Sequence, residues 1–370
     1  MPIASNQKLM YEIIENMSTM VRVMDEQDTI TYMNKRMRAE FGNRIGCKCF
    51  EMLGLPGHCI DCAGIRTLRT KEIETKEFEC GDKFYRIIAS HVFVEEAGHF
   101  TIELLNDITD QKLLERDFLK HYNKLKGDIS FAKQIQITAL PPDKVYWNAL
   151  RVQSAYLPSE DLGGDLFDIL RVDEERCLFY IADVSGHGVR SALLTMFLRQ
   201  VIRGMKAGAA DLLSVIDELI HSYQELHIDT EQYISVLIGL YNMKTRALSL
   251  VNAGHNCLPL VVEQDNRETV ITEIKLFGMP ICSLLRHPNH EIKILQMEKG
   301  DRLLLYTDGI PEALNGQTGK YFGMQNLLKV IMKNSENNWD KMAELIVQKA
   351  KSFAVTSPVD DMAALVIEIL

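Results

Sequence analysis

Four acidic sites in the C-terminal two-thirds of the chain lie at the ends of apolar runs that predict strands, and three of them stand beside small or turn-forming residues. Carboxylates folded into one place repel one another and raise each other's pKa unless a cation compensates. Oxygen ligands without a Cys or His partner suit Mg²⁺ or Mn²⁺, and two such ions can activate a water for attack on a phosphoryl group. The four sites are Asp165, Asp183, Asp308 and the pair Asp360 and Asp361.

Each aspartate taken alone has a plainer explanation, because aspartate is a common helix-capping and turn residue. Four such sites together favour a shared chemical purpose over four independent caps. The hypothesis therefore depends on whether the four carboxylates meet in the folded chain.

A second cluster consists of cysteines: Cys47, Cys49, Cys59 and Cys62 lie within sixteen residues, and Cys80 is a spare candidate. Four thiolates could hold zinc or an iron–sulfur cluster. A thiol redox sensor is the second interpretation and a set of ordinary reduced cysteines is the third.

The elements that must position these groups fall into three regions. Residues 8–108 contain strand-like runs, among them a predicted hairpin of Val21–Asp25 with Thr29–Asn34, and are typical of a small α+β module with an antiparallel sheet. Residues 145–370 combine strand-like runs with helical ones, which predicts packed sheets covered by helices.

Between them, residues 109–140 predict one long helix that ends before Pro141. Apolar residues recur along it at alternating spacings of four and three, which indicates either a short two-stranded coiled coil or a helix docked on its own chain. These residues are Phe118, Tyr122, Leu125, Ile129 and Ala132.

Bulk properties exclude several classes of protein. The 370 residues carry a net charge of −10 without a Lys/Arg block, which argues against nucleic acid as the main partner. The sequence has no uncharged apolar run long enough for a transmembrane helix and no secretory signal, so we expect a cytoplasmic protein without membrane contact.

A series of short motifs in residues 153–370 resembles the PPM (type-2C-like) phosphatases of the bacterial SpoIIE/RsbU branch. The motifs, in order, are Gly163–Asp168, Ala182–Val189, Asn252–Asn256, Tyr306–Ala313 and Asp360–Ala363. The resemblance implies an αββα sandwich in which metal-bound water hydrolyses phosphoserine or phosphothreonine on a protein, with two Mn²⁺ or Mg²⁺ as cofactors.

The resemblance also implies a role for each matching residue. Asp183 would bridge both ions, Asp165 and the backbone carbonyl of Val184 would bind one, and Asp308 and Asp360 the other. Asp361 is the alternative to Asp360. Four further residues would support a ligand or orient the substrate: Asp168, His187, Asn252 and His255. Hydrogen bonds that hold their turns are the favoured explanation for the two histidines, and Asp168 could equally be a plain strand-end carboxylate.

Residues 8–112 resemble a PAS sensory domain, through the hairpin and through the exit sequence Asn106–Lys112. That resemblance implies a sensor that acts through a helical linker, so we expect a signal-regulated, homodimeric phosphatase. Relatives of this branch act on STAS-type anti-sigma-factor antagonists, which makes such a phosphoprotein the expected substrate. A catalytically silent phosphatase fold that only binds a partner is the alternative. A sensor kinase is disfavoured, because the sequence has no Gly-rich ATP-binding loop.

Overall fold

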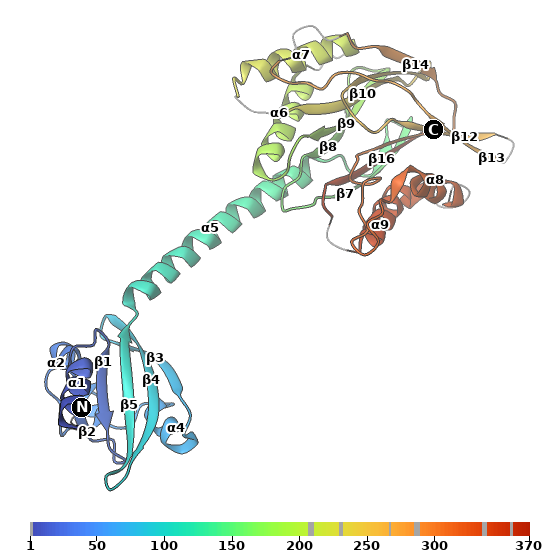
Figure 1. Cartoon of the computed structure of the whole chain (residues 1–370). Helices are drawn as coiled ribbons and strands as arrows, with labels where there is room; N and C mark the ends of the chain where they lie inside the picture. The colour runs from blue at the N-terminus through green and yellow to red at the C-terminus, as the bar shows by residue number, and fades with distance from the viewer. Residues whose placement is uncertain are drawn as a thin grey trace. The chain divides into compact units, whose positions relative to one another are not determined.

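The computed structural model describes residues 3–205, 211–228, 232–265, 268–284, 289–334, 339–355 and 358–370. Its internal contacts divide the chain into two units, Met1–Lys124 and Leu125–Leu370. The division falls inside helix α5 (Thr109–Ala139), whose extent confirms the predicted long helix (Figure 1). The first part of α5 therefore belongs to the N-terminal unit and the second part to the C-terminal unit.

The N-terminal unit is built on one antiparallel sheet with the strand order β2-β1-β5-β4-β3. The predicted hairpin is confirmed, since β1 pairs with β2. Methionines and other apolar side chains on the inner face of the sheet pack against the short helices. The elements are α1 (Ile3–Glu15), β1 (Met20–Met24), β2 (Ile30–Met33), α2 (Lys35–Phe41), α3 (Cys49–Met52), α4 (Ala63–Thr70), β3 (Glu74–Cys80), β4 (Lys83–Val94) and β5 (Gly98–Asp107).

The C-terminal unit contains two antiparallel sheets. One has the order β14-β11-β10-β9-β8 and the other β13-β12-β15-β16-β7-β6. The strands are β6 (Lys144–Tyr146), β7 (Leu150–Leu157), β8 (Asp165–Arg171), β9 (Arg176–Val184), β10 (Ile234–Asn242), β11 (Ala247–Ala253), β12 (Leu260–Asp265), β13 (Glu268–Glu273), β14 (Ile292–Gln296), β15 (Arg302–Tyr306) and β16 (Met362–Ile369).

Helices cover the outer face of each sheet, as Figure 1 shows. One apolar core lies between the first sheet and helices α6 and α7, a second lies between the two sheets, and a third joins the second sheet to α8 and α9. This is the predicted four-layer αββα arrangement. The helices are α6 (Val189–Met205), α7 (Leu212–Glu225), α8 (Gly323–Asn334) and α9 (Met342–Ala354), the last preceded by a short 3₁₀ turn, Trp339–Lys341.

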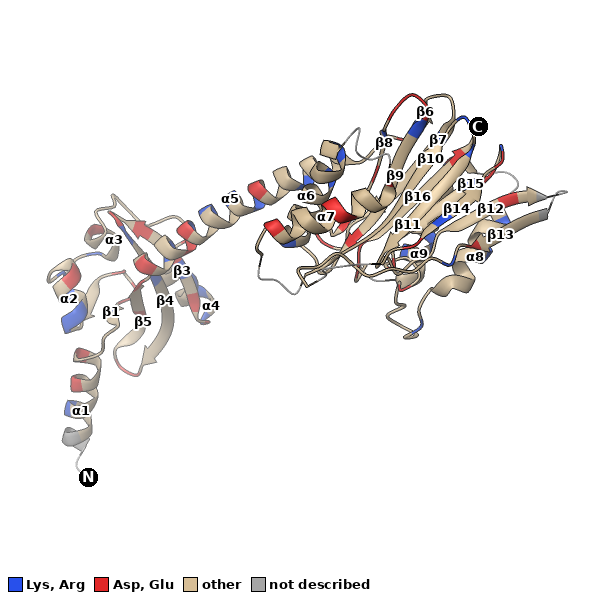
Figure 2. Ribbon diagram, turned by 90° about the horizontal axis from the view of Figure 1, so that it is seen from above, with Lys and Arg blue, Asp and Glu red and all other residues tan. Residues whose placement is uncertain are grey.

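Strand alternation decides which side chains can reach the space between the sheets. In β8, Phe167 and Ile169 belong to the core between the sheets, whereas Leu166 and Leu170 belong to the core under α6 and α7. Because successive side chains of a strand point to opposite faces, Asp165 shares the inter-sheet face with Phe167. The strands are mostly uncharged along their length (Figure 2).

Within the residues that the structure describes, no helix combines the length and the apolar character needed to cross a lipid bilayer.

Candidate active site

The carboxylates of the two sheets come from adjacent strand ends. Asp165 begins β8 and Asp183 lies near the end of β9, and the two residues are direct cross-strand partners. In the other sheet β15 pairs with β16, so Asp308, which follows β15, and Asp360, which precedes β16, lie at the same end of neighbouring strands. Each of these two antiparallel strand pairs therefore brings two of the four predicted acidic sites to the same end of its sheet.

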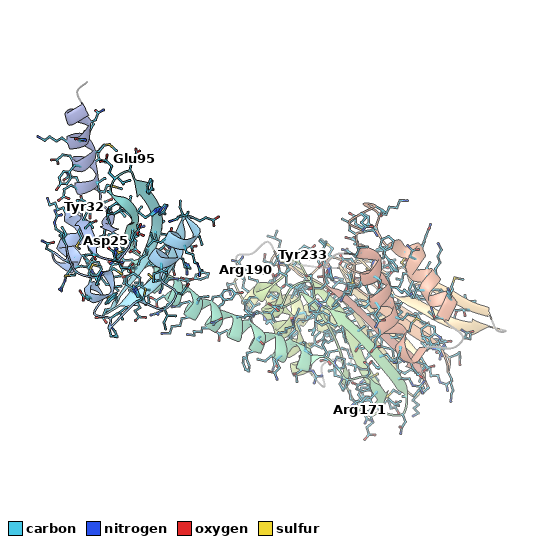
Figure 3. All side chains as sticks on the ribbon, turned by 90° about the horizontal axis from the view of Figure 1, so that it is seen from below. Asp25, Tyr32, Glu95, Arg171, Arg190 and Tyr233 are labelled. Atoms are coloured by element: carbon cyan, nitrogen blue, oxygen red, sulfur yellow. The ribbon has the colours of Figure 1, made fainter. Side chains whose placement is uncertain are left out.

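Hydrogen bonds between the sheets join these two pairs. Thr307 Oγ1 donates to Asp165 Oδ2 at 2.7 Å, and the Gly164 amide donates to Asp361 Oδ2 at 2.5 Å. Both bonds connect the start of β8 to the ends of β15 and β16. The four predicted acidic sites therefore converge at one edge of the sandwich. Figure 3 shows Arg171, at the other end of β8, well apart from Arg190 and Tyr233.

The electrostatics of the cluster match this convergence. Burial, followed by repulsion from Asp183, raises the pKa of Asp165 well above its ordinary value. Burial and the neighbouring Asp308 and Asp360 raise the pKa of Asp183 to about 7. Burial also raises the pKa of Asp360, to which Asp308 adds. Since each carboxylate destabilises the charge of the others, a divalent cation would relieve a repulsion that the protein itself does not neutralise.

Asp360 and Asp361 have different surroundings. The buried Asp361 carboxylate accepts hydrogen bonds from the Ser159 amide at 2.6 Å, from Ser159 Oγ at 2.9 Å and from the Gly164 amide. The exposed Asp360 side chain accepts only from the amide of Asp361, at 2.8 Å, among the bonds found in the described residues. Asp361 thus fastens two loops, whereas Asp360 keeps oxygen atoms free for a ligand.

Close packing of the backbone brings the start of β8 against the end of β9. A Cβ atom at Gly164 would lie 2.5 Å from the Val184 carbonyl oxygen, so only glycine permits this approach. The Val184 carbonyl therefore lies beside Asp165. Across the described ranges, however, no three His, Cys, Asp or Glu side chains already stand in the arrangement of a metal site. The carboxylates are near enough to repel one another without forming a finished ligand set.

His255 and Asn252 hold turns. The buried His255 ring makes a hydrogen bond from Nε2 to the Tyr306 carbonyl, 3.0 Å away, and burial lowers the pKa of this histidine. Asn252 accepts from the His255 amide and donates to the Leu276 carbonyl. Both residues thus fix the loop beside the strand that leads to Asp308.

His187 differs from His255 because it is exposed. Its Nδ1 lies 3.0 Å from a carboxylate oxygen of Glu160, and it lies near enough to Asp360 to lower the pKa of that carboxyl. It therefore stands at the rim of the cluster, where it can meet a substrate.

Asp168 does not reach the cluster. Its buried carboxylate accepts from Arg203 Nε at 2.6 Å and from Arg203 Nη2 at 2.8 Å, and Arg199 Nε lies 3.3 Å away. Asp168 stands three residues from Asp165 and so points to the opposite face of β8, toward α6. The expectation that Asp168 supports the metal site is wrong in position, and its contacts are those of a strand-to-helix ion pair.

Sequence reasoning missed residues that connect the motifs. Thr307 carries the bond between the sheets, Ser159 holds Asp361, and the buried Tyr156 hydroxyl, near Gly163 and Asp361, has no partner among the described residues. Glu312 has its pKa raised by burial and by Asp308. Thr307 and Glu312 fall inside a quoted motif, whereas nothing in the pattern marks Tyr156 or Ser159.

The cysteine cluster does not form the predicted four-thiol site. Cys49, Cys59, Cys62 and the spare candidate Cys80 line one cavity of the N-terminal unit, and Cys47 is not among its lining residues. All eight cysteines are free thiols. Across the described residues, these thiols do not stand in the arrangement of a metal site, so the geometry gives no support to zinc or an iron–sulfur cluster at this cavity.

Comparison with known proteins defines the class. The chain superimposes on the SiaA-PP2C domain of Pseudomonas aeruginosa with a TM-score of 0.58 and 19% identity, over 67% of this chain and 98% of that domain. The C-terminal unit therefore has the PP2C phosphatase fold. Residues 173–370 match SpoIIE, stage II sporulation protein E, and the chain belongs to the SpoIIE family. The match begins after β8, so Asp165 lies outside it.

Two curated relatives come from Bacillus subtilis strain 168. Phosphoserine phosphatase RsbP is 28% identical over 190 residues, which are 50% of this chain and 45% of that protein. Phosphoserine phosphatase RsbU is 23% identical over 189 residues, 51% of this chain and 55% of that protein. The chain thus spans about half the length of the curated relatives it matches.

Proposed function

We propose that the chain is a metal-dependent protein serine/threonine phosphatase whose active site is the carboxylate cluster of the C-terminal unit. The observation that carries the proposal is the Thr307–Asp165 hydrogen bond between the sheets, together with the mutual rise of the carboxyl pKa values. The PP2C fold and the SpoIIE family membership support the same catalytic class.

The residues present suit Mn²⁺ or Mg²⁺, because the donors are all oxygens and their charges are not neutralised by the protein. Asp183 would bridge two ions, with Asp165 and the Val184 carbonyl on one side and Asp308 and Asp360 on the other. We prefer Asp360 to Asp361 because three protein donors already occupy Asp361. When bound, the ions lower the pKa of a water and neutralise charge on the phosphoryl group.

The chain's own residues orient these groups. Thr307 Oγ1 fixes one oxygen of Asp165, and Asp361 fixes the loops at Ser159 and Gly164 on which the approach of β8 to β9 depends. His187 is exposed at the rim, where its ring can donate a proton to the departing serine oxygen or orient the phosphoprotein.

For the substrate we propose phosphoserine on a protein, with a STAS-type anti-sigma-factor antagonist as the specific partner. The names of RsbP and RsbU as phosphoserine phosphatases support the chemical class. The N-terminal unit would be a PAS sensor that regulates the enzyme through α5. Its five-stranded antiparallel sheet and short helices are consistent with that proposal.

The test is turnover of a phosphoserine peptide in saturating Mn²⁺ by purified wild type and by Asp183→Asn. Loss of a bridging ligand should cost more than the roughly 10–100-fold that outer partners of a metal ligand typically cost. Asp217→Asn is the matched control, because Asp217 is exposed on α7. Near-normal turnover by a folded Asp183→Asn protein would refute the bridging role. Wild type without turnover but with binding of the phosphoprotein would favour the catalytically silent alternative.

A further inference from the structure

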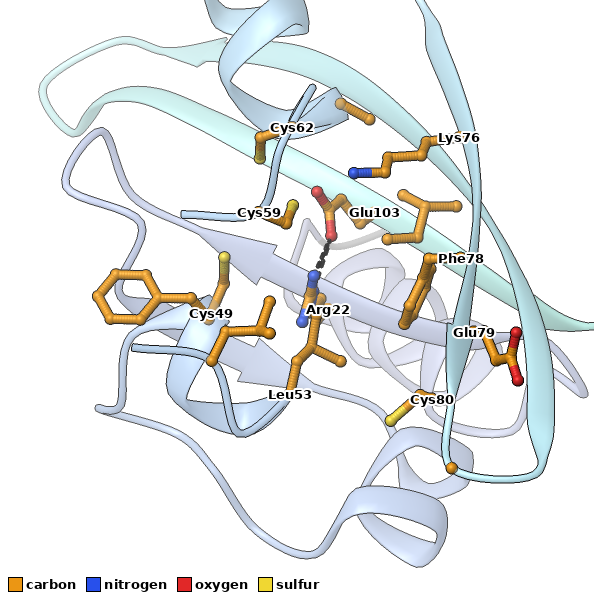
Figure 4. A pocket seen from close by; sticks show the side chains of 15 residues that line it. Arg22, Cys49, Leu53, Cys59, Cys62, Lys76, Phe78, Glu79, Cys80 and Glu103 are labelled. Atoms are coloured by element: carbon orange, nitrogen blue, oxygen red, sulfur yellow. Dashed lines mark hydrogen bonds and ion pairs between the residues drawn. The ribbon is translucent and has the colours of Figure 1, made fainter. Parts of the chain in front are cut away.

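A cavity of about 270 Å³ in the N-terminal unit brings thiols and a buried ion pair together (Figure 4). Phe50, Leu53 and Phe78 contribute apolar walls. Four of the cavity's residues are cysteines, which nothing in the proposed phosphatase chemistry uses; they are Cys49, Cys59, Cys62 and Cys80.

A buried Arg22–Glu103 pair contributes to the polar side of the cavity, which Lys76 and Glu79 also line. Arg22 and Glu103 are cross-strand partners of β1 and β5, and both are 2% exposed. Arg22 Nε donates to Glu103 Oε2 at 2.8 Å and Nη2 donates to the same oxygen at 2.5 Å. An ion pair in a core is weak support for stability, since desolvation opposes it. Because the pair lines the same cavity as the cysteines, its charges lie where they can act on the thiols.

The backbone brings Cys59 and Cys62 together. Ile60 and Asp61 form a turn in which Asp61 has a φ of 55°, so the cysteines are its first and fourth residues. The Cα atoms of such residues lie within about 7 Å, and disulfides need Cα separations of roughly 4.4–6.8 Å. The two thiols already interact, since Cys59 raises the pKa of Cys62 by charge and by a hydrogen bond, after the larger effect of burial.

The thiols differ in exposure and therefore in how readily an oxidant can reach them. Cys49 and Cys62 are only 4% and 8% exposed, and burial raises the pKa of Cys49 to about 12. Cys59 is half-buried, as is Cys80, and both are more accessible than Cys49 and Cys62. Arg22 opposes the larger effect of burial by lowering the pKa of Cys49, so its charge can stabilise a thiolate that forms transiently inside the cavity.

We propose that Cys59 and Cys62 are a modification site, a dithiol that a hydroperoxide converts into an intrachain disulfide. The Cys59 thiol loses its proton and its sulfur attacks the outer peroxide oxygen. An S–O bond forms, the O–O bond breaks, and the alcohol leaves with a proton. Cys62 sulfur then attacks Cys59 sulfur, the S–S bond forms, the S–O bond breaks and water leaves. In sum, two thiols and one hydroperoxide give one disulfide, one alcohol and one water.

The apolar walls favour an organic hydroperoxide over hydrogen peroxide as the oxidant. Both carry the same reactive O–O bond, so the comparison of cumene hydroperoxide with hydrogen peroxide separates the two sources. A disulfide at this turn would fix the segment that leads directly into α4.

The experiment uses the full chain, reduced and then exposed to each peroxide, with free thiols counted by alkylation and mass spectrometry after denaturation. Two of the eight thiols should become protected and should return with dithiothreitol, at lower concentration for cumene hydroperoxide. Cys59→Ser and Cys62→Ser should each abolish the protection. Cys47→Ser, a control from the same segment but outside the cavity, and Cys49→Ser should keep it.

A sulfenic-acid probe identifies the attacking thiol and does not require the disulfide to form. Dimedone should label Cys59 in the Cys62→Ser variant and should leave Cys62 unlabelled in Cys59→Ser. If eight alkylatable thiols remain in the folded wild type at peroxide doses that oxidise free cysteine, the proposal is wrong. Protection that survives Cys59→Ser or disappears in Cys49→Ser would likewise overturn the assigned pair.

Discussion

Asp360 and Asp361 are chain neighbours, yet their side chains differ in the two properties that decide metal binding. Asp361 is buried with three donors on its carboxylate, while Asp360 is exposed and retains free acceptor capacity. The sequence alone left the two open, because adjacent residues before a strand point in opposite directions and the pattern does not fix which one faces the cluster.

Substitution of the two aspartates should therefore give opposite phenotypes. Asp360→Asn should weaken Mn²⁺ binding and turnover with little change in the free energy of unfolding. Asp361→Asn should cost about 1–3 kcal/mol of stability, because a buried acceptor of three hydrogen bonds is altered. Urea unfolding and a Mn²⁺ titration of phosphatase rate measure the two effects. A stable Asp361→Asn protein with lost metal affinity would reverse the assignment.

Asp183 also makes the metal-free protein sensitive to pH. Its folded pKa of about 7 lies above its ordinary value of 3.8, so the folded state binds the proton more tightly than the unfolded state. Stability of the metal-free protein should then fall as pH rises from about 4 to about 7 and stay low above that range.

Asp183→Asn should remove this penalty. At pH 8 without metal, the variant should be roughly 1–3 kcal/mol more stable than wild type, after allowance for partial exposure of the carboxylate. At pH 4 the two should be equal, because wild-type Asp183 is then protonated. Saturating Mn²⁺ should stabilise wild type preferentially. Denaturant unfolding at each pH checks this, and a variant less stable than metal-free wild type at pH 8 would contradict it.

At the scale of elements, the strand period explains both a success and an error. Apolar runs placed β9, β15 and β16 correctly, and the acidic sites at their ends did converge. The same period of two places Asp165 and Asp168 on opposite faces of β8, which accounts for the position of Asp168 away from the carboxylate cluster. The Thr307–Asp165 bond could not be predicted, because it depends on how two sheets pack and not on any single strand. Which cysteines line the cavity of the N-terminal unit, with Cys80 included and Cys47 not, likewise depends on the tertiary fold.

Asp168→Asn tests the position of this residue. The change weakens the ion pairs with Arg203 and Arg199, so we expect a loss of about 1–3 kcal/mol, less than for a fully buried pair because both arginines are partly exposed. The Mn²⁺ concentration for half-maximal activity should stay unchanged. A shift in that concentration without a loss of stability would return Asp168 to the metal site.

At the scale of the whole molecule, α5 has two kinds of surface. Its end packs within the C-terminal unit, where Gln136 Nε2 donates to the Gly163 carbonyl at 2.6 Å, and Ile129 and Ala132 are partly buried. Earlier along the helix, Phe118, Tyr122 and Leu125 are 67%, 51% and 59% exposed. The second half of the helix is therefore docked on its own chain, as one of the two sequence interpretations expects, while the coiled coil stays a prediction for the exposed half.

The exposed half predicts a dimer. Three large apolar side chains spaced four and three apart form a stripe that a second copy of the helix can cover, so the wild type should dimerise in solution. Leu125→Glu places a charge in this stripe and should shift the protein to monomer, whereas Lys124→Glu, the adjacent exposed residue, should not. Sedimentation velocity over a range of concentrations measures both. Wild type that stays monomeric throughout, or equal behaviour of the two variants, would show that this stripe is not the dimer interface.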